Sequence, residues 1–111
     1  MSKSQRIKGH SFEREIAIDL SEVFHESVKR NIGQARDGGD DITLPPFRIE
    51  CKRRAHIAVY KWLEQVIAAT KMDDEIPVVV ARADQQESIV ILRYSDFCDL
   101  MRSHKVFLST I

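Results

Sequence analysis

Phe47-Arg48-Ile49-Glu50-Cys51-Lys52 is the stretch that decides the fold, because apolar and charged residues alternate along it. Successive side chains of a β-strand point to opposite faces. A strand over 47–53 therefore turns its apolar residues to one face and presents Glu50 and Lys52 together on the other. The simplest interpretation of such a pair is a solvated ion pair on an edge strand, which contributes little to stability.

Upstream of this strand, apolar residues recur at three- and four-residue spacing and predict a helix over 10–26. The apolar stripe consists of Phe12, Ile16, Leu20 and either Val23 or Phe24. Glu13 falls in line with Ala17 and Leu20, so we expect it to face inward or into a cleft. A carboxylate in such a place needs a partner, a metal ion or a raised pKa. The alternative is a partly exposed acid in the first helical turn, where the helix dipole favours it.

The rest of the chain predicts short strands around a second helix. Asp41-Ile42-Thr43-Leu44 and the strand over 47–53 are separated by Pro45-Pro46, which indicates an antiparallel hairpin that brings Asp41 towards Glu50. A helix over 58–72 carries Trp62, Leu63, Val66 and Ile67 as a core or dimer-interface stripe. We expect further strands over 28–32, 76–81, 88–92 and 106–108, and a short helix from Tyr94 that bears Phe97, Leu100 and Met101.

This order of elements predicts an α/β fold, in which a mixed central sheet is flanked by helices. The chain of 111 residues is long enough for one domain, 1–111, and too short for two. Hydrophobic residues make up 43% and charged residues 31%, which is typical of a soluble globular protein. The sequence contains neither a bilayer-length apolar run nor a signal-peptide pattern, so we expect an intracellular, cytoplasmic protein.

Net charge is zero, and the two cysteines, Cys51 and Cys98, predict neither a disulfide framework nor a zinc site. Charge is nevertheless uneven, because basic residues gather at the start of the chain and again at Arg53 and Arg54. Local basic patches can bind phosphate even in a neutral protein. Composition alone therefore leaves a nucleic-acid partner open.

Glu13, Asp41 and Glu50 supply the hard oxygen atoms that Mg²⁺ prefers, and the backbone carbonyl of Cys51 is a possible further ligand. Hydrolysis of a phosphodiester needs an activated water, neutralised phosphate charge and a stabilised leaving oxygen, and divalent metals supply all three. Lys52 would stand beside such a metal and stabilise the developing charge or orient the water. The four residues together therefore form a candidate metal-dependent hydrolase site.

These residues carry a family resemblance. Glu13, then Asp41, then Glu50-x-Lys52 resembles the core of the PD-(D/E)xK nucleases, which have a restriction-endonuclease-like fold. Within that superfamily, Lys8-Gly9-x-x-x-Glu13-Arg14-Glu15, followed by Arg30 and a glycine-bearing loop, is similar to archaeal-type and phage-borne Holliday junction resolvases. The loop Arg36-Asp37-Gly38-Gly39-Asp40 is longer than the family pattern and offers Asp40 beside Asp41. Asp41 is the preferred ligand because it directly precedes the apolar Ile42.

The resemblance implies roles for single residues. Glu13, Asp41 and Glu50 correspond to metal ligands, Lys52 to the catalytic lysine and Gln65 to a supporting glutamine, with Asp40 as a second supporting residue. The basic residues expected near DNA are Lys8, Arg14, Arg30, Arg36, Arg53 and Arg54. Phosphate contacts of this kind position the backbone rather than read the bases.

The function that follows is a Mg²⁺-dependent endonuclease, for which Mn²⁺ substitutes, that makes paired symmetric nicks in four-way DNA junctions. The likeness implies a homodimer, and a C2 dimer places two identical sites on a symmetric substrate. We also expect a phage-encoded protein that acts in the host cytoplasm and has no membrane partner. Two alternatives stay open: a nicking or restriction-like nuclease on duplex or branched DNA, and a catalytically idle DNA-binding module of the same fold.

Overall fold

The computed structural model describes residues 3–31, 41–70 and 73–109, and side chains between Gly9 and Lys105 within those ranges. Among these residues, three helices and five strands follow one another in the order expected from the sequence, apart from the strand expected over 106–108. They are α1 (Lys3–Phe24), β1 (Lys29–Arg30), β2 (Ile42–Leu44), β3 (Phe47–Arg54), α2 (Val59–Ala69), β4 (Ile76–Ala83), β5 (Ile89–Ile91) and α3 (Tyr94–Ser109).

The five strands form one mixed sheet in the order β1-β2-β3-β4-β5. β2 and β3 pair antiparallel, with Ile42 opposite Ile49, so the expected hairpin is confirmed. β3 and β4 pair in parallel over their whole length, and α2 makes the crossover between them. β3 is therefore the middle strand, and the edge-strand interpretation of Glu50 and Lys52 is wrong.

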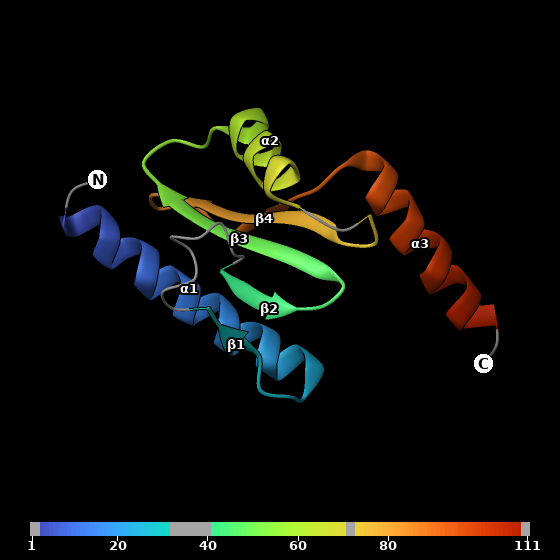
Figure 1. Ribbon diagram of the computed structural model, residues 1–111. Helices are drawn as coiled ribbons and strands as arrows, with labels where there is room; N and C mark the ends of the chain where they lie inside the picture. The colour runs from blue at the N-terminus through green and yellow to red at the C-terminus, as the bar shows by residue number, and fades with distance from the viewer. Residues whose placement is uncertain (1–2, 32–40, 71–72, 110–111) are drawn as a thin grey trace.

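A helix covers each face of this sheet, with α1 on one side and α2 on the other (Figure 1). Under α1, Phe12 and Ile16 pack with Ile49, Cys51 and strand residues of β2 and β4. Under α2, Trp62 and Val66 pack with Val79 and Ala81 of β4. These two layers confirm the α/β architecture, and they account for the continuous apolar run of β4, which is buried on both faces.

Three expectations about element bounds were wrong. Residues 106–108 continue α3 rather than form a strand, and α3 is a helix of 16 residues rather than a short one. α1 begins at Lys3, well before residue 10. Its last turn exposes both Val23 and Phe24, although one of the two was expected in the apolar stripe. α3 also carries exposed apolar side chains, among them Phe97 and Met101.

Within residues 3–31, 41–70 and 73–109, no helix is long and apolar enough to cross a membrane.

Phe12 anchors α1 to the sheet, because its side chain is fully buried against β2, β3 and β4. We expect Phe12→Ala to lower the free energy of unfolding by about 3–5 kcal/mol, the usual cost of deleting a buried phenyl ring and leaving a cavity. Urea unfolding followed by circular dichroism measures the effect. Phe24→Ala is the matched control on the same helix, because Phe24 is 47% exposed, and it should cost less than about 1 kcal/mol. Equal losses in the two variants would contradict this account of the core.

Candidate active site

Asp41 lies at the start of β2, where it ends the ladder between β2 and β3. Its backbone N–H donates to the carbonyl of Ile49 at 2.9 Å, and its own carbonyl accepts from the N–H of Asn31 at 2.9 Å. The N–H of Cys51 then donates to the side-chain oxygen Oδ2 of Asp41 at 2.7 Å. The carboxylate thus accepts from a β3 backbone amide at the end of the ladder. Asp41 is buried, with 7% of its surface exposed, and its orientation is fixed by these bonds.

Glu50 is the neighbour of Asp41 across the hairpin, because the antiparallel register pairs the following Ile42 with Ile49. Burial raises the pKa of Glu50 to about 8, and the charge of Asp41 and a side-chain hydrogen bond with Asp41 act in the same direction. Lys52 and Arg48 oppose the rise. The Asp41 charge thus favours the protonated form of Glu50, because two adjacent carboxylates repel each other when both are ionised.

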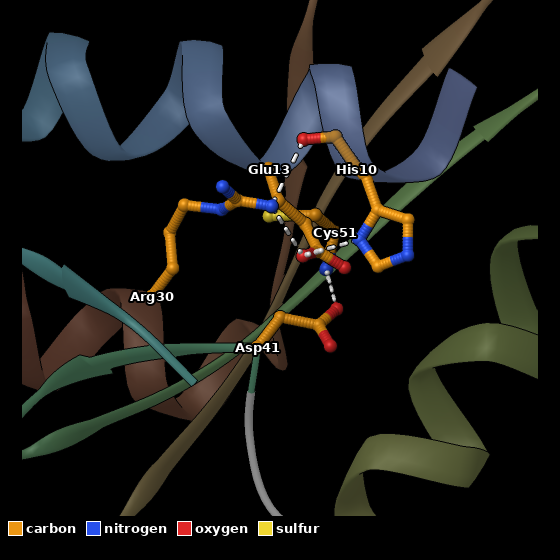
Figure 2. Close-up of polar contacts among 5 residues, drawn as sticks. All are labelled: His10, Glu13, Arg30, Asp41 and Cys51. Carbon is orange, nitrogen blue, oxygen red and sulfur yellow. Dashed lines mark hydrogen bonds and ion pairs between the residues drawn. The ribbon is translucent and has the colours of Figure 1, made fainter. Parts of the chain in front are cut away.

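Glu13 reaches the same region from α1, and Figure 2 shows its carboxylate on the α1 side of Asp41. Its side chain is 17% exposed, and its Oε2 lies 3.5 Å from Nη2 of Arg30 and 3.9 Å from Nδ1 of His10. Burial raises the pKa of Glu13, the charge of Asp41 adds to the rise, and Arg30 opposes it. The inward orientation expected from the helical pattern is confirmed.

Asp41 is the hub of the three acids. Its charge raises the pKa of Glu13 and of Glu50, and after burial it is the largest influence on the raised pKa of the Cys51 thiol. The side chain of Cys51 packs under α1, so strand alternation turns Glu50 to the opposite face. Asp41, at the end of the hairpin, lies between the acid on α1 and the acid on β3.

This arrangement fits a divalent cation held by two carboxylates better than one held by three. Among the described residues, no group of three or more His, Cys, Asp or Glu side chains is placed to hold a metal ion. Mg²⁺, however, commonly takes only one or two protein carboxylates and completes its shell with water and substrate phosphate. Asp41 and Glu50 form such a hard-oxygen pair, and the Cys51 peptide adjoins it. Glu13 instead contacts the Arg30 guanidinium.

Two basic residues accompany the acids on β3. Lys52 is half-buried, and its charge lowers the pKa of Glu50, so the Glu-x-Lys pair acts electrostatically as a unit. Arg48 is buried, and its Nη1 lies 3.7 Å from Oε2 of Glu75, just before β4. The sequence placed Arg48 on the charged face but gave no sign of this partner, because Glu75 is distant along the chain.

The remaining predicted residues are dispersed. Arg14 on α1 and Gln65 on α2 are exposed, while Arg30 lies against Glu13. Arg53 has its Nε 4.0 Å from Oδ1 of Asp84, and Arg54 donates from Nη1 to the carbonyl of Arg53 at 2.9 Å. Arg36 and Asp40 lie outside the described residues, as does the side chain of Lys8. Sequence reasoning missed the contact of His10 with Glu13, which only its three-residue spacing could have suggested.

Comparison with known families bears on the whole chain. A family model described as "Phage putative PDDEXK endonuclease" matches residues 4–111. The chain belongs to this family. The resemblance to the PD-(D/E)xK nucleases, drawn from Glu13, Asp41, Glu50 and Lys52, is therefore confirmed at the level of the superfamily. No curated protein and no solved structure matches the chain.

Membership of the phage PD-(D/E)xK endonuclease family sets the general chemistry. Nucleases of this superfamily generally use divalent metal ions, and a nuclease binds DNA. The five-stranded mixed sheet with helices on both faces is consistent with a restriction-endonuclease-like core. The Glu50-x-Lys52 pair, which is part of the family resemblance, lies on the middle strand of this sheet.

The raised pKa of Glu50 predicts how the stability of the protein varies with pH when no metal is bound. An acid whose folded pKa lies above its ordinary 4.5 binds a proton more tightly in the folded state. The free energy of unfolding should therefore fall as pH rises from about 4.5 to about 8 and level off above that, by on the order of 2 kcal/mol after allowance for solvent screening. Added Mg²⁺ should stabilise most at the upper end, because metals bind ionised carboxylates.

Urea unfolding at pH 5, 6.5 and 8, with and without Mg²⁺, measures this dependence. Glu50→Gln is the matched variant, because it keeps the size of the side chain and removes its titration. The wild-type slope between pH 5 and pH 8 should become shallower in Glu50→Gln. A profile that is the same in both proteins would contradict the assignment of the raised pKa to Glu50.

Proposed function

We propose that this protein is a divalent-metal-dependent DNA endonuclease of Holliday junction resolvase type, which nicks four-way junctions in symmetric pairs. The observation that carries the proposal is the arrangement of Asp41, directly before β2, against Glu50 and Cys51 on β3, where Lys52 follows Glu50 by two residues. Two carboxyl groups that could hold a divalent metal ion, with a lysine beside them, suit metal-assisted hydrolysis of a phosphodiester.

Asp41, Glu50 and the carbonyl of Cys51 would hold the metal, which neutralises phosphate charge and activates water. Asp41 is held rigidly by the ladder, so its carboxylate stays oriented without reorganisation. Lys52 brings a positive charge next to Glu50, where it stabilises the charge that develops on the phosphate. Mg²⁺ is the proposed ion and Mn²⁺ a substitute, because both suit oxygen ligands.

Junction selectivity needs two sites related by a two-fold axis, because the two cuts are symmetric. Each chain carries one Glu50-x-Lys52 pair, so a homodimer is part of the proposal. The exposed Arg14, together with Arg53 and Arg54 at the end of β3, would contact backbone phosphate. A phage origin, as the family description has it, agrees with action on branched DNA in the host cytoplasm.

A substrate comparison tests the proposal. The protein is incubated with Mg²⁺, and in parallel with Mn²⁺, on a labelled four-way junction, a nicked duplex and a linear duplex of equal length. Paired symmetric nicks in the junction alone support the resolvase. Cleavage of the linear duplex favours the nicking or restriction-like nuclease of the same family. Absence of cleavage with either metal, together with retained DNA binding, leaves the idle DNA-binding module. Gel filtration that shows only monomer at micromolar concentration would contradict the dimer.

A further inference from the structure

Arg30 connects β1 to α1 through two contacts at one end of its side chain. Its Nη2 donates to the backbone carbonyl of His10 at 3.2 Å and lies 3.5 Å from Oε2 of Glu13 (Figure 2). The backbone of Arg30 is held at the other end, because it pairs with Ile42 in the sheet. The side chain therefore spans from the strand next to Asp41 to the helix that carries Glu13.

The guanidinium of Arg30 is poorly placed to meet DNA. Only 17% of its side chain is exposed, and its Nε is buried without a hydrogen-bond partner among the described residues. Arg14, the neighbour of Glu13 on the same helix, is exposed instead. Turning Arg30 outwards would leave the half-buried Glu13 carboxylate without its cation, and breaking such a pair is costly.

We propose that Arg30 is a positioning residue that holds the Glu13 carboxylate beside Asp41 and balances its charge, and that it makes no contact with DNA phosphate. The inference rests on the proposed function, because it takes Asp41 as a metal ligand and Glu13 as the acid that approaches Asp41 from α1. It reassigns Arg30, which the family resemblance placed among the DNA-binding residues. Arginine suits this role, because its planar guanidinium orients a carboxylate and also balances its negative charge.

Removal of Arg30 has two opposite consequences. The positive charge next to Glu13 disappears, so the site becomes more negative and should bind a divalent cation more tightly in the free protein, by roughly tenfold. At the same time, Glu13 loses the group that orients it, so turnover should fall while the Michaelis constant for DNA changes little. A direct phosphate contact would produce the reverse pattern, with weaker DNA binding and unchanged metal affinity.

Mn²⁺ binding without DNA, measured by electron paramagnetic resonance, gives a readout that is independent of cleavage. We expect Arg30→Ala to bind Mn²⁺ about tenfold more tightly than wild type. Arg30→Lys, which keeps the charge, should bind Mn²⁺ like wild type and regain part of the turnover. Arg30→Gln, which keeps a donor for the His10 carbonyl, provides a second charge-removing variant if the alanine variant folds poorly.

DNA affinity as a function of salt, measured with chelator present, separates the two roles of a basic residue. Each phosphate contact contributes about one unit to the slope of log affinity against log salt. Arg30→Ala should keep the wild-type slope. Arg14→Ala is the matched variant on the exposed side of the same helix, and its slope should fall by about one.

A lower salt slope in Arg30→Ala together with unchanged Mn²⁺ affinity would overturn the positioning role and return Arg30 to the DNA interface. Failure of the proposed function has a different signature. In that case the wild-type protein binds no Mn²⁺ and cleaves no DNA, whatever residue stands at position 30.

Discussion

Lys52→Ala is expected to lower the rate of DNA cleavage by about a thousandfold or more, while DNA affinity stays within a few-fold of wild type. Lys52 follows Glu50 by two residues on the middle strand, and its positive charge lowers the pKa of Glu50. A positive charge at this place helps the transition state, where charge accumulates on the phosphate, more than it helps the ground state. Single-turnover cleavage and equilibrium binding separate these effects.

Two variants identify how Lys52 acts. Lys52→Arg keeps the charge that lowers the pKa of Glu50, so it should restore activity only if the lysine works through Glu50. If the ammonium itself meets the phosphate, the arginine variant should stay slow, because a guanidinium differs in shape and donor geometry. Lys61→Ala is the control for a general loss of positive charge, because Lys61 is exposed on α2. Full activity in Lys52→Ala would remove this residue from the mechanism.

Asp41→Asn is expected to abolish cleavage and, with chelator present, to tighten DNA binding by a few-fold. The amide oxygen can still accept the hydrogen bond from the N–H of Cys51, so the ladder end and the fold should persist. DNA binding is measured above about pH 8, where Glu50 is ionised in both proteins, so that loss of the Asp41 charge lowers the negative charge of the site and its repulsion of phosphate. The cleavage rate should fall by about a thousandfold or more, as expected when a principal metal ligand is lost.

Asp41→Ala and Asp19→Asn complete the test. Asp41→Ala leaves the buried N–H of Cys51 without its acceptor, so it should also lose about 1–3 kcal/mol of stability. Asp19 is exposed on α1, and Asp19→Asn removes one negative charge without touching the site. DNA affinity that does not change between wild type and Asp41→Asn, with or without chelator, would contradict the view that metal governs DNA binding.

The parts of the fold that depend on local pattern were predictable from the sequence. The alternation over 47–53 identified β3 as a strand, although not its middle place in the sheet, and Pro45-Pro46 marked the turn that sets Asp41 opposite Glu50. The inward orientation of Glu13 followed from its place in the helical repeat of α1. Each of these features is encoded by residues within a few positions of one another, where spacing determines which side chains share a face.

The contacts that modify the site were not predictable, because they join residues far apart in the chain. Arg30 contacts Glu13, which lies 17 residues earlier in the sequence. Arg48 contacts Glu75 and is buried, whereas the alternating pattern showed only that Arg48 lies on the charged face of its strand. The sequence-based picture of the site, with three carboxylates and one lysine, therefore lacked the positive charges of Arg30 and Arg48 near these acids. The mistaken strand over 106–108 has a related cause, because a short apolar run does not distinguish a strand from the last turns of a helix.

Folding and catalysis make different demands on the Asp41 side chain. The fold needs only an oxygen atom that accepts the hydrogen bond from the N–H of Cys51, whereas the proposed metal site needs the negative charge. The amide oxygen of an asparagine at position 41 can accept the same hydrogen bond. The single change Asp41→Asn is therefore expected to abolish cleavage while the protein still folds. If the protein forms the proposed homodimer, such an inactive chain would still pair with an active one and occupy the same DNA. In a homodimer that must cut twice, loss of function at Asp41 is therefore expected to be dominant over the intact copy, whereas loss through unfolding would be recessive.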